Sequence, residues 1–190
     1  MAINGNINMI RIKTLEMAGM RSVLEALRLP FGKECRSCVC ASYDYNDSSF
    51  VTKSSSNIDD RDLHLLSVLV KRGDEHSKVL RGLNVWVEIN APRYFWSEAD
   101  TYRVGTERLS SESTMHIQGK GLATDELVKM KSELKEGTMQ KRIQMFSYQC
   151  LRRIWLQRHN HRLPEWHDFC AWIESLPLSE ELITIGNNND

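Results

Sequence analysis

The segment LNVWVEINAPRYFWSEADTYRVGTERLSSESTMH, residues 83–116, passes from one pattern to another within a few residues. Its first eight residues, 83–90, alternate apolar and polar side chains, and this period of two predicts a strand with one buried face. Pro92 ends the strand because proline cannot donate to the ladder of a sheet. We expect a helix over residues 93–102, followed by irregular structure rich in Ser and Gly.

Side chains that suit a nucleotide gather in the same segment. Arg93 and Arg103 carry guanidinium forks, which match pairs of phosphate or carboxylate oxygens. Tyr94, Trp96 and Tyr102 offer flat faces on which a base or a flavin could stack. The alternative is a polar junction between helix and loop, in which Ser and Thr hydroxyls satisfy the nearby backbone. The residues alone leave both interpretations open.

The rest of the chain is mostly helical in pattern. Alternation predicts an edge strand over residues 7–14, and apolar spacing predicts helices over 15–28, 58–72, 124–137, 139–158 and 165–176. Residues 33–57 are rich in Ser, Asp, Asn, Tyr and Cys and predict a long loop that is mobile or faces a ligand. We expect a flexible tail over 184–190. The sum is an α+β chain, a helix-rich single domain over residues 1–190 with a small mixed or antiparallel sheet.

Composition argues against several classes of function. The 25 Lys and Arg residues balance 25 Asp and Glu residues, so the basic excess typical of proteins that bind duplex nucleic acid is absent. No run of about 18 apolar residues predicts a membrane span, and the start MAINGNINMIRIKT lacks the apolar centre of a signal peptide. Neither a serine-hydrolase elbow nor a glycine-rich phosphate loop occurs. We therefore expect a cytoplasmic protein that meets any phosphate locally.

Cysteine spacing raises the question of a zinc site. Cys35, Cys38 and Cys40 include the C-x-x-C pair that usually supplies half of such a site. The other half is missing, since Cys150 and Cys170 each stand alone within predicted helices. An odd total of five cysteines also argues against a disulfide framework. We expect reduced thiols and no bound metal.

Histidines and arginines gather where two predicted helices meet, in QRHNHRLPEWH, residues 157–167. His159, His161 and His167 are candidate metal ligands, whereas Arg158 and Arg162 are candidate anion ligands. The competing interpretation is that basic side chains are favoured at the C-terminus of a helix. We expect no metal here and keep Arg158 as a candidate phosphate ligand.

From Leu65 onward the chain resembles the central region of flavin-dependent thymidylate synthases. In that family a helix ends at a Gly-His turn, a strand runs to an Ala-Pro break, and a helix leads into an Arg-His-Arg motif and a Ser-rich segment. Here His76 matches the turn histidine, Ala91 and Pro92 match the break, and Arg103 matches the last arginine of the motif. The resemblance implies a homotetramer that binds flavin and deoxyuridine monophosphate (dUMP) where subunits meet, with a folate as one-carbon donor.

The resemblance also implies ligand roles for particular side chains, while it leaves the catalytic residues unknown. The implied flavin (FAD) ligands are His76, Tyr102 and Arg103. The implied ligands of a pyrimidine nucleotide are Arg103, Ser111, Ser113 and Arg158, and we add Arg93 and Arg108 as candidate ligands because they lie nearby in the sequence.

The motif departs from the family pattern. Thr101 and Tyr102 stand where the family has arginine and histidine, and the arginine of the later S-x-R-Y motif is absent near Ser113. Arg81, Arg93 and Arg108 are additional arginines nearby that could compensate. Such divergence resembles phage-encoded relatives of the family.

Three functions follow as alternatives. The first is methylation of dUMP with flavin and folate. The second is a catalytically inactive phage protein that sequesters a nucleotide, for example a host defence signal, in the host cytoplasm. The third is a structural or partner-binding protein whose polar cluster lines a subunit contact.

Overall fold

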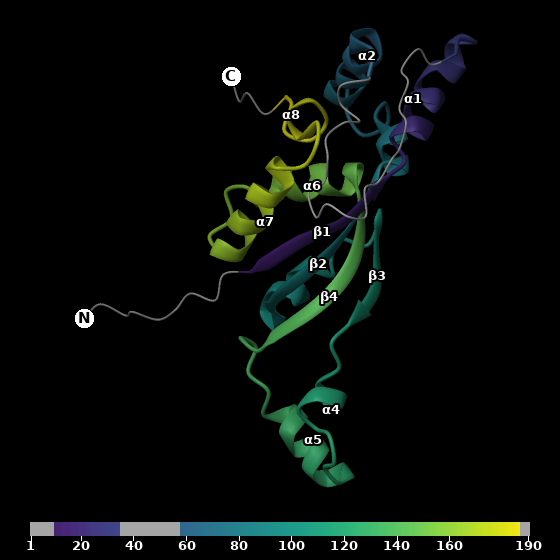
Figure 1. The fold of residues 1–190 in the computed structure, drawn as a ribbon. Coiled ribbons are helices and arrows are strands. Elements are labelled where there is room, and N and C mark those ends of the chain that lie inside the picture. Colours follow the sequence, from purple (N-terminus) through teal and green to yellow (C-terminus); the bar gives the residue numbers. More distant parts are fainter. Residues whose placement is uncertain (1–9, 35–57, 187–190) are drawn as a thin grey trace.

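The computed structural model describes residues 10–34 and 58–186 (Figure 1). Its elements are β1 (Arg11–Ala18), α1 (Met20–Arg28), the 3-10 helix η1 (Leu29–Phe31), α2 (Asp60–Lys71), the 3-10 helix η3 (Lys78–Gly82), β2 (Asn84–Pro92), α3 (Arg93–Ala99), β3 (Thr106–Ser111), α4 (Thr114–Ile117), α5 (Thr124–Ser132), β4 (Met139–Ser147), α6 (Tyr148–Arg158), α7 (Pro164–Glu174) and α8 (Ser179–Leu182). Helices thus alternate with four strands, and the prediction of a helix-rich α+β fold is confirmed.

The four strands form one sheet in the order β1-β2-β4-β3, and every neighbouring pair is antiparallel. β4 is therefore a central strand that pairs with β2 on one side and β3 on the other. The ladder of β1 is irregular between Thr14 and Glu16, and that of β3 between Arg108 and Ser110. β1 and β3 are the two edge strands.

One face of the sheet is packed against helices. Val85, Val87 and Ile89 of β2 are completely buried and share one core with Phe95 of α3 and Phe169 of α7. The side chains between them on β2 point to the other face and are only half buried. The alternation predicted for residues 83–90 is thus confirmed, and it places α3 directly on the buried face.

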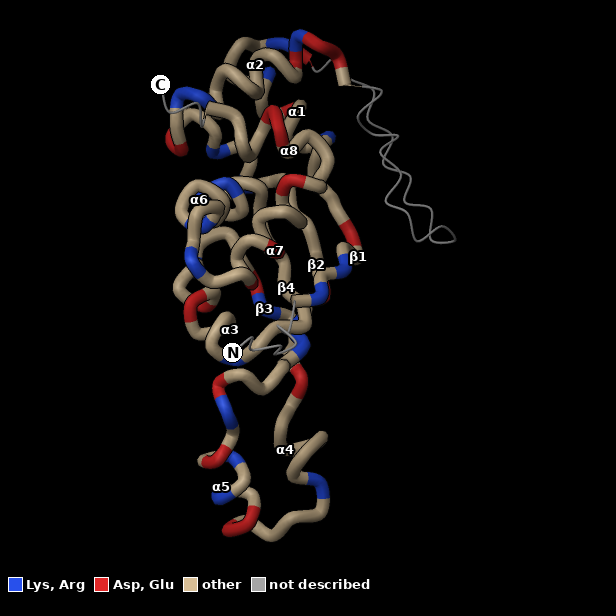
Figure 2. Tube along the Cα trace, turned by 90° about the vertical axis from the view of Figure 1, so that its left-hand side faces the viewer, with Lys and Arg blue, Asp and Glu red and all other residues tan. Residues whose placement is uncertain are grey.

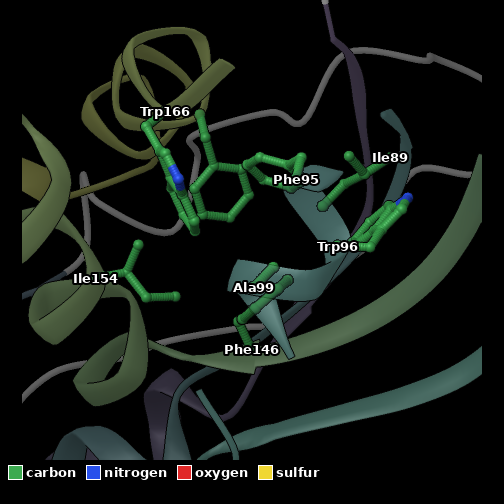
Figure 3. Close-up of a pocket in the computed structure, with 8 residues that line it drawn as sticks. Ile89, Phe95, Trp96, Ala99, Phe146, Ile154 and Trp166 are labelled. Carbon is green, nitrogen blue, oxygen red and sulfur yellow. The ribbon is translucent and has the colours of Figure 1, made fainter. Parts of the chain in front are cut away.

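An aromatic group fills the space between the sheet and these helices (Figure 3). The ring of Phe95 lies 4.6 Å from that of Trp166 and 5.4 Å from that of Trp96, measured between ring centroids. The hollow among them leaves no room for a water molecule. Trp96 lies at the margin of the group, and its ring nitrogen donates to the carbonyl of Gln140 over 2.9 Å. This group is core, and its margin at Trp96 borders the polar site described below.

Residues 112–138, which connect β3 to β4, form an arm that projects beyond the end of the sheet (Figures 1 and 2). Its two helices, α4 and α5, contain no buried residue. They pack on each other at Gly119, where an added Cβ would come within 2.3 Å of the Leu127 side chain. Ile117 and Val128 are each 61% exposed. Basic residues (Lys and Arg) and acidic residues (Asp and Glu) are interspersed along the arm and over the rest of the chain (Figure 2).

The largest error of the sequence prediction concerns residues 139–158. They were expected to form one helix, whereas 139–147 are strand β4 and only 148–158 are helix α6. The boundary is Ser147, whose hydroxyl accepts from the backbone N–H of Cys150 over 3.2 Å and so begins α6. Strand β3 lies in a segment that was expected to be irregular, and α5 ends at Ser132, earlier than predicted.

The first strand and helix are shifted relative to the prediction. β1 extends to Ala18 because its last residues still pair with β2, so the helix expected from residue 15 begins at Met20. Gly19 allows this change of direction. Its φ is 102°, and an added Cβ would come within 1.8 Å of the carbonyl oxygen of Gly82.

Other predictions fall partly outside the described residues. Of the predicted loop 33–57, residues 35–57 lie outside them, as do Cys35, Cys38 and Cys40. Of the predicted tail, residues 187–190 lie outside, and in the described portion Arg152 Nη1 donates to the carbonyls of Ile183 and Ile185, the latter over 2.9 Å. Within the described ranges, no helix has the length and apolar character needed to cross a membrane.

Candidate functional site

The side chain of Arg142 lies at the centre of the candidate site. It projects from the buried face of β4, and the residue is only 8% exposed. Its guanidinium lies 4.3 Å from the ring centroid of Trp96, and Nη1 donates to Asp100 Oδ1 over 2.8 Å. Burial lowers the pKa of Arg142 below its ordinary value, and the Asp100 carboxylate opposes that shift. An arginine nevertheless keeps its proton at neutral pH.

A pocket of about 240 Å³ opens beside this guanidinium, and we call it the arginine pocket. Its wall is almost entirely polar. The residues that line it are Arg93, Trp96, Ser97, Asp100, Glu136, Gln140 and Arg142.

Two elements and the end of the arm position these side chains. In α3 and its C-cap, positions 93, 96, 97 and 100 repeat at helical spacing and therefore share one face. In β4, Gln140 and Arg142 are two residues apart and point to the same face of the sheet. The end of the arm is tied to the start of α3, because the N–H of Tyr94 donates to the carbonyl of Glu136 over 3.1 Å.

Arg93 differs from Arg142 in having no anionic partner among the described residues. Its Nε is buried, and no described residue accepts a hydrogen bond from it. An unpaired buried donor is costly, particularly in a charged group. Arg93 and Arg108 also add their positive charges to the effect of burial in lowering the pKa of Arg142. The pocket therefore places two guanidinium groups together, and one of them keeps a donor without an acceptor among the described residues.

Three of the predicted nucleotide ligands lie around Arg142. Arg93 lines the pocket, and Arg108 lies with Nη1 3.9 Å from the second carboxylate oxygen of Asp100. Ser111 on β3 is the ladder partner of Arg142 on β4, so the two side chains are neighbours on one face. Arg142 itself was not among the predicted ligands, because its segment was expected to be a helix.

A second cluster joins α3 to α6 and α7 and contains two further predicted residues. Arg158 Nη1 pairs with Glu98 Oε2 over 2.7 Å, and Arg158 Nε donates to the hydroxyl of Tyr102 over 2.8 Å. Trp166 Nε1 donates to the same Glu98 oxygen over 2.9 Å, and the guanidinium lies 4.6 Å from the Trp166 ring centroid. We call these four residues the Arg158 cluster. Its polar groups form hydrogen bonds and an ion pair with one another, so we interpret the cluster as a structural link between α3, α6 and α7.

The remaining predicted ligands do not join either group. His76 is exposed in the turn before η3, Arg103 is exposed between α3 and β3, and Ser113 occupies the N-cap position of α4 without a side-chain cap hydrogen bond. The turn with His76 contacts the start of α6, since Gln149 Nε2 donates to the carbonyl of Asp74. Tyr102 contacts the other end of α6, where its hydroxyl accepts from Arg158, so the turn with His76 and Tyr102 meet opposite ends of that helix.

The described residues include no group of three or more His, Cys, Asp or Glu that could hold a metal. His159 stacks on Trp155 with ring centroids 4.6 Å apart, whereas His161 lies 3.7 Å from Glu98.

Burial raises the pKa of the Cys150 thiol to about 11 and that of Cys170 to about 12, so both stay protonated near neutrality.

The fold is similar to that of solved flavin-dependent thymidylate synthases. One is the enzyme ThyX from Helicobacter pylori complexed with FAD and dUMP, with a TM-score of 0.61 and 14% identity, over 91% of this chain and 97% of that one. Another structure of Helicobacter pylori ThyX with FAD and dUMP gives a TM-score of 0.62 and 14% identity, over 92% and 96% of the two chains. No protein-family model matches the sequence, and no curated protein matches it. The expected fold is thereby confirmed.

Proposed function

We propose that this protein binds a pyrimidine nucleotide and holds its phosphate in the arginine pocket. The observation that carries the proposal is the buried Nε of Arg93, which has no acceptor among the described residues and lies beside the guanidinium of Arg142. Phosphate oxygens match guanidinium forks in geometry and charge, and hydrogen bonds to charged groups contribute about 1.5–3 kcal/mol each. A bound phosphate would give the Arg93 guanidinium the anionic partner that it lacks among the described residues.

The similar solved structures support a pyrimidine nucleotide as the ligand. Both contain dUMP, and Arg93, Arg108 and Ser111 were candidate nucleotide ligands from the sequence. In this structure all three lie around Arg142. We therefore take dUMP as the first ligand to test.

Methylation of dUMP with flavin and folate is a second candidate function, favoured by the similarity to structures that contain FAD. The residues expected to hold the flavin do not fit it as a group within one chain. The turn with His76 and the side chain of Tyr102 contact opposite ends of α6, none of the three residues lines the arginine pocket, and the Tyr102 hydroxyl already contacts Arg158 and Gln157. We therefore favour the catalytically inactive alternative, in which a phage protein in the host cytoplasm sequesters a nucleotide.

We also propose that the protein is a homo-oligomer, with a tetramer implied by the family resemblance. The arm exposes Met115, Ile117, Leu122 and Val128, which its own chain leaves uncovered in the described ranges. Helix α5 carries acids in its first turn and lysines in its last turn, so two copies paired antiparallel would place unlike charges opposite one another. Light scattering tests this assembly, and a Val128→Asp variant should shift it towards smaller species.

The experiment that tests the proposed function is a search for copurified ligand followed by titration. The purified protein is denatured, and its extract is examined by mass spectrometry and by absorbance for nucleotide and flavin. Addition of dUMP should then raise the Tm, because a ligand that binds only the folded state stabilises it. Near-stoichiometric flavin would favour the methylating function, whereas nucleotide without flavin would favour sequestration. Absence of any nucleotide, with no response to added dUMP, would contradict both.

A further inference from the structure

The arginine pocket offers no free aromatic face on which a base could stack. Trp96 is its one aromatic residue, and the guanidinium of Arg142 lies 4.3 Å from the centroid of that ring. The edge of the ring is also engaged, since its Nε1 donates to the carbonyl of Gln140. Bases bound by proteins often stack on aromatic side chains, and the one aromatic face of this pocket is already covered by Arg142.

Its size leads to the same conclusion. The volume of about 240 Å³ lies below the roughly 300–1,000 Å³ of pockets that enclose drug-sized ligands. A complete nucleotide would therefore not be enclosed, whereas a phosphate with part of its sugar would fit.

A sugar phosphate needs cations for its phosphate and acceptors for its sugar hydroxyls. The arginines supply the first, and Glu136 can supply the second. Glu136 is among the residues that line the pocket, and no described residue forms an ion pair with its carboxylate. The other carboxylate, Asp100, is bonded to Arg142, and both ends of the Gln140 amide are used by Arg142 and the carbonyl of Glu112. An ionised carboxylate accepts hydrogen bonds from hydroxyls and repels phosphate. It would therefore turn the phosphate towards Arg93 and the sugar hydroxyls towards itself.

We infer that the arginine pocket recognises the sugar phosphate of its ligand, with Glu136 accepting from a sugar hydroxyl, and leaves the base outside. This inference rests on the proposed function, since it concerns the same pocket. It goes further in one respect, because it says that the base contributes little to binding. The ligands of the pocket are then phosphorylated pentoses in general, with or without a base.

The test compares dissociation constants from isothermal titration of the full-length protein with ribose 5-phosphate, dUMP, adenosine monophosphate, uridine and orthophosphate. We expect the first three ligands to agree within about fivefold, and uridine to bind at least about tenfold more weakly, since it lacks the phosphate that the arginines hold. If dUMP binds and ribose 5-phosphate does not, the base is required and the inference is wrong, although the proposed function stands. If ribose 5-phosphate binds and no nucleotide does, the base prevents binding instead of lying outside the pocket, and both the proposed function and the inference are wrong. If neither binds, both are wrong.

A variant isolates the role of Glu136. Glu136→Ala should weaken ribose 5-phosphate about tenfold relative to orthophosphate, because it removes both a hydroxyl acceptor and a charge that repels phosphate. Glu133→Ala is the matched control, since Glu133 is exposed on the same arm and does not line the pocket. An unchanged ratio of the two dissociation constants in Glu136→Ala would overturn the assigned role.

Discussion

Asp100 Oδ1 accepts a hydrogen bond from Arg142 Nη1 over 2.8 Å, and the same carboxylate lies 3.9 Å from Arg108 through its other oxygen. The side chain of Asp100 is 44% exposed, whereas that of Arg142 is 9% exposed. The carboxylate therefore provides, from the solvent side, the kind of oxygen that a phosphate would provide. In the protein without ligand, Asp100 occupies the buried arginine, and an incoming anion would have to compete with it for Arg142.

This relationship predicts the effect of removing the competing charge. Asp100→Asn should lower the free energy of unfolding by about 1–3 kcal/mol, because Arg142 loses its charged acceptor. The same variant should bind dUMP more tightly than the unaltered protein does. The measurement is the increase in Tm at saturating dUMP, which should be larger in the variant although its starting Tm is lower.

The matched control is Asp125→Asn, an exposed acid in the first turn of α5. It should leave the response to dUMP unchanged. Equal responses in Asp100→Asn and the unaltered protein would contradict the assignment of Arg142 as a phosphate ligand.

Removal of the Arg93 guanidinium should have the opposite effects: it should raise the stability of the protein without ligand and weaken the binding of dUMP. Arg93→Met keeps most of the side-chain volume and removes a buried donor that no described residue satisfies. We expect the free energy of unfolding to rise by about 1 kcal/mol and the Tm by about 2–4 °C. Thermal denaturation without ligand is the measurement. A fall in Tm would show that Arg93 already has a partner that stabilises the fold.

The Arg158 cluster is expected to contribute stability. Glu98→Ala leaves Arg158 without its carboxylate and Trp166 Nε1 without its acceptor, so the free energy of unfolding should fall by about 2 kcal/mol. Glu98→Gln retains an acceptor for both partners, so its free energy of unfolding should fall by less than that of Glu98→Ala. Denaturant unfolding measures both, with Glu107→Ala on the exposed edge strand as a control that changes stability by no more than about 0.5 kcal/mol. Full stability in Glu98→Ala would contradict a structural role for the cluster.

The Tyr94 hydroxyl predicts a dependence on alkaline pH. Burial, followed by its hydrogen bond to Glu165 and the charge of that carboxylate, raises the pKa of Tyr94 from 10.0 to about 12. Because the folded protein holds the proton more tightly than the unfolded chain does, this contribution to stability is complete below about pH 10 and is lost as the pH rises to about 12.

The measurement is the difference in the free energy of unfolding between the unaltered protein and Tyr94→Phe. It should be constant from pH 7 to about 9 and shrink from about pH 10 to 12. Burial also raises the pKa of Tyr148, but that tyrosine is present in both proteins and cancels. A difference that is independent of pH would contradict the environment described for Tyr94.

Much of the fold could be predicted from local pattern, and β4 shows where such a prediction fails. Ile143, Phe146, Cys150 and Ile154 are spaced three and four apart, which is the pattern of a helix continuing into α6. In the structure, the buried face of β4 alternates instead through Arg142, Gln144 and Phe146. Two of those three side chains are polar, whereas the apolar residues Ile143 and Met145 lie on the opposite, half-buried face, so the alternation did not indicate which face is buried. Pairing with strands on both sides outweighs the local pattern.

The same error explains why the candidate site was only partly predictable. Arg93, Arg108 and Ser111 were selected from their own segment, whereas Arg142 lies more than 30 residues further along the chain and meets them through the pairing of β3 with β4. The side chain of Ser147, which begins α6, was the one local signal that could have divided the predicted helix and placed Arg142 in a strand. β3 carried no such signal, since its exposed residues give no apolar period.

The central claim is that the arginine pocket binds the phosphate of a nucleotide, and the affinity for dUMP in Arg93→Met tests it most directly. Isothermal titration would compare this variant with the unaltered protein and with Arg72→Met, which removes an exposed arginine at the end of α2. We expect Arg93→Met to bind dUMP at least about tenfold more weakly while Arg72→Met binds it as the unaltered protein does. Equal dissociation constants in all three proteins would contradict the claim.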